Sequence, residues 1–289
     1  MKTAFVTGGA EGQGHLLAKK LAQRGWKVFA GIYPGAKGPG FADEPNVTPV
    51  EQDVSDTASV LRSAEAVKTA LGDGGLDLLL NVAGIANIGV GVLEGANIDD
   101  MKRLFDVNTF GQLRVVQAFL PLMRKASPRG RIVNYASGAV LVSPPAAGGY
   151  NMSKHAIHGM TLTLRNELAS FGIQVTTIMP GGVKTAMTAN AHQTTKDMWD
   201  KTPAAVRAIY EPSLYGPTTQ VLPDMLEKQG STADQVTDDL LKILQIKRWK
   251  SFYTVGKDAA MLGPMHKLLP ERWFESIMRS TYQLPSYKG

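Results

Sequence analysis

The stretch "TGGAEGQG", residues 7–14, joins an apolar run to an amphipathic pattern near the start of the chain. The run "TAFVTGG" (3–9) predicts a buried strand, and "GHLLAKKLAQRG" (14–25) predicts a helix that ends at Gly25. Glycines at such a junction allow a tight turn, and the free N–H groups of the helix start can bind a phosphate. The stretch therefore indicates a dinucleotide-binding turn. A simple tight turn is the alternative, because one glycine-rich turn is weakly specific.

Strand-like apolar runs and helical patterns alternate beyond this turn. Strands are expected at residues 3–9, 26–33, 47–54, 76–84, 130–137 and 173–182, and helices at 14–25, 56–71, 99–125 and 150–171. Continuous apolar strands that alternate with helices form a parallel sheet covered on both faces. The sequence therefore predicts an α/β protein with one Rossmann-like doubly wound parallel sheet, in a single domain over residues 1–289.

The last third of the chain departs from this alternation. Residues 1–184 are expected to form the cofactor-binding and catalytic core, and residues 185–289 a substrate lid with C-terminal helices. One strand-like run, "SFYTVG" (251–256), interrupts the helical patterns. The apolar stripe at 259–278 is interpreted as core or subunit contact, with a substrate lid or a membrane-surface helix as alternatives.

Composition narrows the class of protein. The 289 residues are 44% hydrophobic and 19% charged, which is typical of a folded globular chain, and no cysteine is present to form a disulfide or a thiolate metal site. The chain enters its first strand without a signal peptide, and no apolar run is long enough to span a membrane, so a cytoplasmic protein is expected. The net charge is +6, but only "KRWK" (247–250) clusters basic residues. This cluster is interpreted as a solvated helix end, and no nucleic-acid partner is expected.

A second motif carries titratable side chains. "GGYNMSKHAIHG" (148–159) places Tyr150 and Lys154 four positions apart, and hence on one face of a helix. The same helix carries His155 and His158, but no third ligand is evident nearby, so no metal site is expected. Spacing alone leaves Tyr150 and Lys154 open to an ordinary structural role.

Taken together, the motifs resemble those of the short-chain dehydrogenase/reductase family. In family order, the chain contains "TGGAEGQG" (7–14), "DV" (53–54), "NVAG" (81–84), "VNTFG" (107–111), Ser137, the Tyr150/Lys154 pair and "PGGVKTAM" (180–187). The resemblance covers about residues 3–190. The layout of the whole chain is also loosely similar to the retinol and hydroxysteroid dehydrogenase branch.

The resemblance implies a role for each of four side chains. Tyr150 is the general acid/base, and Lys154 lowers the pKa of the phenol and holds the nicotinamide ribose. A free phenol has a pKa near 10 and is a poor base at neutral pH, so a neighbouring cation would favour the phenolate. Ser137 binds the substrate oxygen, and Asn108 bends the long helix and holds a water. The structural alternatives are a turn cap for Ser137, a polar residue inside a helix for Asn108 and a turn former for Asn81.

The cofactor contacts implied by the resemblance are Gly8, Glu11, Gly12, Gln13, Gly14, Ile32, Tyr33, Asp53, Val54, Asn81, Ala83, Gly84, Tyr150, Lys154, Pro180, Gly181, Val183 and Thr185. Ile32 occupies the position of the acid in NAD-preferring members, and Tyr33 that of the arginine common in NADP-preferring members. Glu11 should repel a 2′-phosphate, although Lys37 offers an offsetting charge. NAD(H) is therefore favoured, and NADP(H) is allowed.

The expected function is NAD(P)-dependent hydride transfer to or from a hydrophobic secondary alcohol or ketone that is steroid-, retinoid- or lipid-like. Val140, Leu141 and Val142 are expected to line the substrate site, and Met187 and residues 198–210 to close over it. The alternative is that this segment only completes the core or a subunit interface. Other functions considered are a 3-oxoacyl carrier-protein reductase and a non-catalytic nucleotide-sensing protein. The family commonly pairs through its two long central helices, so a homodimer or homotetramer is expected.

Overall fold

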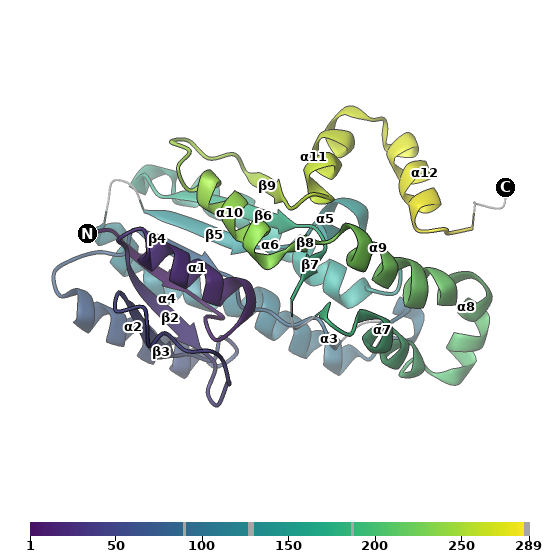
Figure 1. The fold of residues 1–289 in the computed structure, drawn as a ribbon, viewed down its shortest axis with the longest axis horizontal. Coiled ribbons are helices and arrows are strands. Elements are labelled where there is room, and N and C mark those ends of the chain that lie inside the picture. The colour runs from purple at the N-terminus through teal and green to yellow at the C-terminus, as the bar shows by residue number, and fades with distance from the viewer. Residues whose placement is uncertain (89–90, 127–129, 186–187, 286–289) are drawn as a thin grey trace.

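The computed structural model describes residues 1–88, 91–126, 130–185 and 188–285. Within these residues, seven strands form one sheet in the order β3-β2-β1-β4-β5-β6-β9, and every pairing is parallel (Figure 1). The strands are β1 (Thr3–Val6), β2 (Lys27–Ile32), β3 (Val47–Glu51), β4 (Leu78–Asn81), β5 (Arg131–Tyr135), β6 (Gln174–Pro180) and β9 (Phe252–Val255). The strand order reverses between β1 and β4, which creates the crevice where doubly wound folds bind ligands. The predicted fold class is confirmed.

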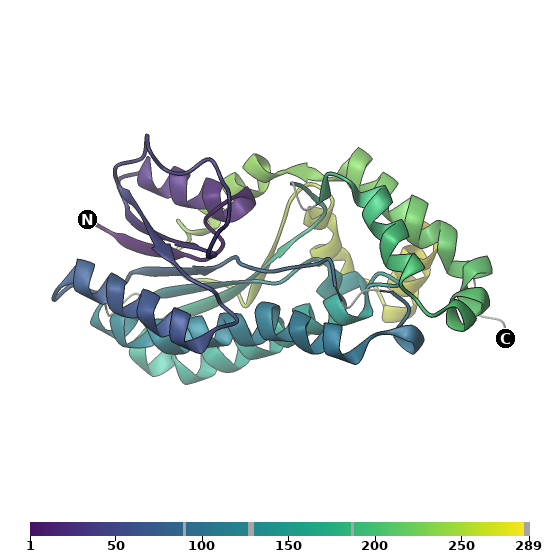
Figure 2. The same cartoon turned by 90° about the horizontal axis from the view of Figure 1, so that it is seen from below.

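Helices cover both faces of the sheet (Figure 2). On one face lie α1 (Gly12–Ala22) and α10 (Ala233–Ile243), and on the other α2 (Thr57–Leu71), α4 (Gly111–Lys125) and α6 (Gly148–Glu167). Each face has its own apolar core, one packed around α1 and α10 and the other around α2, α4 and the end of α6. Burial on both faces explains why β1 and β4 consist of apolar residues with few interruptions.

The long helix expected at 99–125 is divided by a wider turn. It consists of α3 (Ile98–Phe105), a π-helical turn, η2 (Asp106–Phe110), and then α4. Asn97 caps α3 by accepting hydrogen bonds from the backbone N–H groups of Asp99 and Asp100. These two carboxylates therefore begin the helix, where they complement its dipole.

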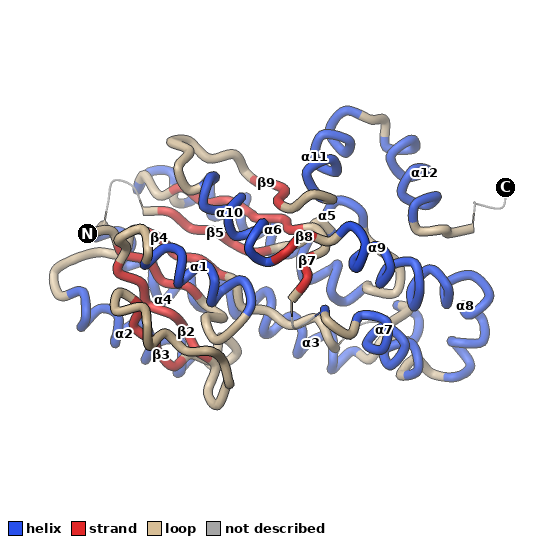
Figure 3. The backbone as a smooth tube through the Cα atoms, viewed as in Figure 1, coloured by secondary structure: helices blue, strands red, loops and turns tan. Residues whose placement is uncertain are grey.

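A separate segment leaves the sheet after β6 and returns before α10. It contains α7 (Ala191–Asp200), α8 (Ala204–Gly216), the π-helical turn η5 (Pro217–Val221) and α9 (Leu222–Gln229). We call residues 185–230 the cover. Its two ends meet where β7 (Val183–Lys184) pairs in parallel with β8 (Ser231–Thr232), and Figure 3 shows the mainly helical cover beside the strand ends of the large sheet.

Two expectations need correction. The boundary expected at residue 184 falls too early, because α10 and β9 complete the core and β9 covers the edge of β6. The cluster "KRWK" is not a solvated helix end, because Trp249 is buried, its Nε1 donates to the carbonyl of Ile243, and the Arg131 guanidinium lies 4.7 Å from its ring centroid.

The stripe at 259–278 forms two helices, α11 (Ala259–Leu268) and α12 (Glu271–Thr281), and α11 contacts β9 and the short helix α5 (Ala139–Val142). Four of its nine large apolar side chains are exposed, including Trp273 at 67%. Phe274 and Met278 are buried in a small cluster, so the stripe is core only in part, and a subunit contact through its exposed side stays a prediction. No helix in the described ranges is long and apolar enough to cross a membrane.

Candidate active site

The glycine-rich turn packs directly against the end of β4. Gly8 has φ +68°, and a Cβ on it would lie 3.1 Å from Ala83 Cα. A Cβ on Gly14 would lie 2.2 Å from the carbonyl oxygen of Gly8. Thr7 Oγ1 accepts the backbone N–H groups of Val82 and Ala83, which holds "NVAG" against the turn. Glycine is therefore required at 8 and 14 by close backbone approach.

This turn fits a dinucleotide phosphate. Glu11, at the N-cap of α1, makes no capping hydrogen bond within the described residues, so the N–H groups of the first helical turn remain available. The Nε2 of Gln13 is buried and has no partner in the described part of the chain. A Cβ on Gly38 would lie 1.9 Å from the Ala10 carbonyl oxygen, so the connection after β2 folds onto the turn. Lys37, beside Gly38, thus belongs to the same region as Glu11.

The remaining predicted cofactor residues lie at or just after the carboxyl ends of the strands. Ile32 ends β2 and Tyr33 is exposed beyond it. Asp53 Oδ1 accepts from the backbone N–H and hydroxyl of Ser55 at 2.8 and 2.6 Å, so this carboxylate also shapes its own turn. Asn81 Nδ2 donates to Asn134 Oδ1 at 2.9 Å. Other members of the predicted set occupy the same edge: Val54, Ala83 and Gly84 follow β3 and β4, Pro180 ends β6, and Gly181, Val183 and Thr185 follow it.

Ser137, Tyr150 and Lys154 are brought together at the end of β5 and the start of α6. The Ser137 hydroxyl lies near the Tyr150 phenol and acts to lower its pKa. Lys154 Nζ lies 5.5 Å from the centroid of the Tyr150 ring and donates to the carbonyl oxygen of Tyr135 at 3.2 Å. Gln112 Nε2 donates to the same carbonyl at 3.0 Å. The lysine is thus held in a fixed position below the phenol.

Burial dominates the pKa of both titratable groups. Burial lowers the pKa of the Lys154 ammonium from 10.5 to about 8. Burial also raises the pKa of the Tyr150 phenol, and the Ser137 hydroxyl opposes this in part. Within the protein alone the expected lowering of the tyrosine pKa by Lys154 is not found. A lysine that loses its proton near pH 8 is nevertheless suited to exchange protons close to neutral pH.

Asn108 lies in the π-helical turn η2, where the helix departs from regular geometry as expected. Its side chain is fixed by the loop after β4, since Oδ1 accepts from Ile85 N at 2.8 Å and Nδ2 donates to Ile85 O at 2.9 Å. A Cβ on Gly84 would lie 3.1 Å from Asn108 Oδ1 and 3.6 Å from Lys154 Nζ. Gly84 therefore allows Asn108 and Lys154 to approach each other, while the bound water stays a prediction.

A mostly apolar cavity of about 180 Å³ adjoins Tyr150. Its other walls include Ala146 and Ala147 from the loop before α6, Met198 and Trp199 from α7, and Leu222 at the start of α9. Of the stretch at 198–210, Met198 and Trp199 line the cavity, and closure of this stretch over a substrate stays a prediction.

The structure does not place the predicted substrate residues Val140, Leu141 and Val142 in this cavity. They form α5, where Val140 and Leu141 pack against Ala136, Ile157 and Met179, and Val142 packs against the α12 cluster. Being close in sequence to Ser137 did not bring their side chains to its reactive face. Met187 lies outside the described residues.

Comparison with known proteins fits this geometry. The profile of the short chain dehydrogenase family matches residues 2–196. The chain belongs to this family. Mouse retinol dehydrogenase 16 is 33% identical over 288 residues, which cover 98% of this chain and 90% of the relative. Rat 17-beta-hydroxysteroid dehydrogenase type 6 is 31% identical over 290 residues, with 99% and 90% covered.

The fold has a similarly extensive match among solved structures. A short chain dehydrogenase from Burkholderia cenocepacia J2315, solved in complex with NADP, is 24% identical, with a TM-score of 0.73 over 99% of this chain and 100% of the other. This short-chain dehydrogenase is therefore an oxidoreductase, and the family resemblance of its sequence is confirmed.

Sequence reasoning missed two residues of this short-chain dehydrogenase, and it gave Trp199 only as part of the stretch at 198–210. Thr218 lines the cavity from the cover, as Trp199 does. Asp258 Oδ2 accepts the backbone N–H of Gly182 at 2.7 Å, and a Cβ on Gly181 would lie 2.1 Å from Asp258 Oδ1. The carboxylate thus supports the "PGG" turn from the far end of the chain. Only the three-dimensional contact, and no local sequence signal, identifies it.

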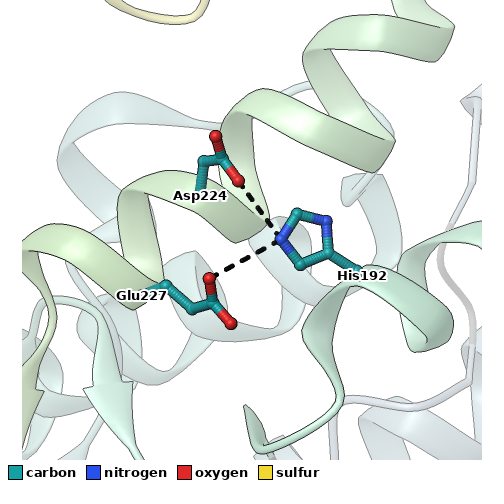
Figure 4. A group of neighbouring side chains, drawn as sticks. All are labelled: His192, Asp224 and Glu227. Carbon is teal, nitrogen blue, oxygen red and sulfur yellow. Dashed lines mark ion pairs between the residues drawn. The ribbon is translucent and has the colours of Figure 1, made fainter.

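The structure also groups His192, Asp224 and Glu227 on the outside of the cover (Figure 4). His192 Nε2 lies 3.2 Å from Asp224 Oδ1 and 3.9 Å from Glu227 Oε2. Lys228 already pairs with the other oxygen of Asp224 at 2.9 Å, and each side chain of the trio is 45% exposed or more. We therefore interpret the trio as a surface link between α7 and α9.

Proposed function

We propose that this short-chain dehydrogenase moves a hydride between NAD(P) and an apolar secondary alcohol or ketone, with Tyr150 exchanging the proton. The observation that carries the proposal is the place of Tyr150, beside both Ser137 and the cavity. Its phenol lies near the Ser137 hydroxyl, and its residue lines the mostly apolar cavity that α7 also lines. A substrate oxygen placed there meets a proton donor and a second hydroxyl at once.

Each side chain has a defined task in this proposal. Tyr150 donates its proton to the carbonyl oxygen in reduction, or accepts the hydroxyl proton in oxidation. Ser137 holds that oxygen and stabilises the charge that develops on it. The Lys154 ammonium, fixed on the Tyr135 carbonyl, favours the phenolate once the proton has left. The nicotinamide, when bound on the glycine-rich turn, supplies or accepts the hydride.

The substrate proposal rests on the cavity wall and on the cover. Apolar groups predominate around Tyr150, which favours a steroid-, retinoid- or lipid-like molecule over a polyol. The cavity of about 180 Å³ is smaller than the roughly 300–1,000 Å³ of ordinary ligand sites, so a bulky substrate requires the cover to move outward. Two relatives are named for retinol and a hydroxysteroid, which supports the same class.

The two alternatives are less well supported. A 3-oxoacyl carrier-protein reductase would share Ser137, Tyr150 and Lys154, but such enzymes usually end soon after the seventh strand. Here α11 and α12 follow β9. A non-catalytic nucleotide sensor would have no need of a tyrosine and a lysine held together in a cavity wall.

For the cofactor we propose a preference for NAD(H) over NADP(H). Neither Ile32 nor Tyr33 offers a charge to the 2′ position, and Glu11 stands at the N-terminus of α1, where a 2′-phosphate would meet a carboxylate. Lys37, on the connection after β2, has the opposite effect, because its positive charge would attract a 2′-phosphate. Because a structural neighbour was solved in complex with NADP, the test of this proposal is to measure kcat/KM with NAD and with NADP.

We further propose a cytoplasmic homodimer or homotetramer. Exposed apolar side chains, Phe110, Met152 and Leu162, lie on η2 and the outer side of α6, the two central helical elements that the family uses for pairing. Light scattering of the purified protein tests the assembly, and a monomer at micromolar concentration would contradict it. Cell fractionation tests the location, and recovery in the membrane pellet would contradict a cytoplasmic protein.

The deciding experiment for the reaction is Tyr150→Phe, assayed with both cofactors against a panel of apolar secondary alcohols and ketones. The change removes one hydroxyl and little volume, so turnover should fall by about 10²–10⁴-fold while cofactor affinity stays nearly unchanged. Lys154→Ala should weaken both. Retention of more than about a tenth of the activity by Tyr150→Phe would refute the proposed role of the phenol.

A further inference from the structure

Two buried polar atoms in the wall of the cavity have no hydrogen-bond partner among the described residues. They are Trp199 Nε1 on α7 and Thr218 Oγ1 on η5. Trp199 is 1% exposed and Thr218 is 6% exposed, and both side chains line the same cavity as Tyr150. Buried donors and acceptors are nearly always paired in folded proteins, so two unpaired atoms in one wall call for an explanation.

Neighbouring threonines show the usual outcome on a helix. Thr195, which also lines the cavity, donates its hydroxyl to the Ala191 carbonyl at 2.9 Å. Thr219, the next residue after Thr218, donates to the Tyr215 carbonyl at 2.7 Å. Thr218 makes no such bond within the described chain, and it lies in the π-helical turn that changes the direction of side chains between α8 and α9. Its hydroxyl is therefore unpaired and covered here, in a residue that lines the cavity, and a ligand reaches it when the cover moves outward.

The Trp199 ring is held rigidly. It packs edge-on against Tyr215, with ring centroids 5.7 Å apart and planes at 74°. A rigid ring with an unpaired N–H gives a directed donor at low cost in conformational entropy when a ligand binds. Because α7 packs against η5, this donor and the Thr218 hydroxyl belong to the same part of the cover.

The cavity thus has side chains with hydrogen-bonding atoms from two parts of the chain. The core supplies Tyr150, and the cover supplies Trp199 and Thr218. The same lining includes the apolar side chains of Met198 and Leu222. A wholly apolar substrate would leave the two atoms on the cover unpaired, whereas a substrate with a second oxygen would satisfy them.

We propose that Trp199 Nε1 and Thr218 Oγ1 form an anchor for a substrate oxygen other than the one that reacts at Tyr150. The proposal rests on the proposed function and narrows its substrate class to apolar alcohols or ketones that carry a second carbonyl or hydroxyl oxygen. The indole N–H can only donate, so that oxygen accepts from Trp199. The threonine hydroxyl can donate or accept, so it serves either oxygen type.

The test uses pairs of compounds that differ only in the second oxygen. One pair is a saturated steroid with an oxygen at each end of its ring system and the same skeleton with one oxygen, and a smaller pair is a cyclohexane diol and cyclohexanol. The wild-type enzyme should favour the doubly oxygenated member by about tenfold or more in kcat/KM, mainly through KM. Trp199→Phe, which keeps an aromatic ring against Tyr215, and Thr218→Val should each remove most of this preference. Thr219→Val is the matched control and should keep it.

Binding to the cofactor-saturated Tyr150→Phe enzyme separates the anchor from the reaction. Calorimetric titration should show the same roughly tenfold preference there, and Trp199→Phe or Thr218→Val in that background should abolish it. Equal affinity for both members of each pair, or a preference that survives both substitutions, overturns the anchor. If the preference in binding is present but the wild-type enzyme turns over neither member, the anchor stands and the proposed reaction fails.

Discussion

Replacement of Lys154 by methionine should stabilise the folded protein at neutral pH. Lys154 is buried, and its Nζ donates one hydrogen bond within the described residues, to the carbonyl of Tyr135. That carbonyl keeps a donor after the substitution, because Gln112 Nε2 also binds it at 3.0 Å. Methionine has a similar length and volume and needs no hydration. Lys154→Met therefore removes a buried charge without leaving an unpaired acceptor.

The size of the effect follows from the shift of the lysine pKa. Burial lowers the pKa of Lys154 from 10.5 to about 8, so keeping this ammonium in the folded state costs about 3 kcal/mol at pH 7. Between these two pKa values the unfolded chain binds more protons than the folded chain, so the stability of the wild-type protein rises with pH in that range. At pH 9.5 the cost falls to about 1.4 kcal/mol.

Urea denaturation of the protein without added cofactor measures this difference. The free energy of unfolding of Lys154→Met should exceed that of the wild type by about 2–3 kcal/mol at pH 7, and by about half as much at pH 9.5. Lys196→Met on the exposed side of α7 is the control, and it should change stability by less than about 0.5 kcal/mol. The Lys154→Met variant should also lack activity, because the ammonium that destabilises the folded protein is the same group that favours the Tyr150 phenolate.

Two results would refute this reasoning. One is a Lys154→Met protein that is less stable than the wild type at pH 7 although its circular dichroism is native-like. The other is a stability difference that stays constant from pH 7 to 9.5, because then the difference does not come from the lysine charge.

Three further predictions concern the cofactor region. Gly14→Ala should destabilise the protein and abolish cofactor binding, since its Cβ would lie 2.2 Å from a backbone oxygen. The control is Gly159→Ala, in open space on α6, which should stabilise the protein by roughly 0.5–1 kcal/mol. Thermal unfolding compares the two variants, and equal effects would contradict the requirement for close backbone approach at Gly14. Asp258→Ala should weaken cofactor affinity about tenfold in a fluorescence titration, because it releases the turn after β6. Asp258→Asn keeps a hydrogen-bond acceptor and should keep most of the wild-type affinity. If Asp258→Ala binds the cofactor as tightly as the wild type, Asp258 does not support this turn. Glu11→Lys should shift the ratio of kcat/KM toward NADP by about tenfold or more, and a wild-type ratio that already favours NADP tenfold would reverse the proposed cofactor preference.

The elements that sequence analysis located best are those fixed by local backbone chemistry. The glycine turn is recognisable because Gly8 and Gly14 meet backbone atoms directly, which allows no other residue. Tyr150 and Lys154 are recognisable because helical spacing places them on one face and the other motifs of the family surround them in order. Strands buried on both faces, such as β4, can be recognised in the sequence as nearly continuous apolar runs.

Contacts between segments far apart in sequence were not predictable in the same way. Thr218 acquires its position only when α7 packs against η5, and nothing in the stretch at 198–210, which was expected to close over the site, distinguishes Trp199 from its neighbours. Val142 follows Ser137 closely in sequence, but its side chain packs against the cluster on α12. The burial of Trp249 depends on Arg131, on a strand more than a hundred residues earlier, so no local pattern indicates it.

The pairing of β7 with β8, which joins the two ends of the cover, affects how this family can change its substrates. The chain leaves at β7 and returns at β8, where Val183 pairs with Ser231 and the Gly182 carbonyl accepts the backbone N–H of Ser231 at 2.8 Å. Both ends of residues 185–230 are thus fastened at one point outside the large sheet. The entropy of closing a loop grows only slowly with its length, so a longer or shorter insertion can be accommodated there while the register of β6 and β9 is kept. The cover is therefore an exchangeable cassette, and a hybrid that carries another member's insertion between these two short strands should inherit that member's substrate range on an unaltered catalytic base.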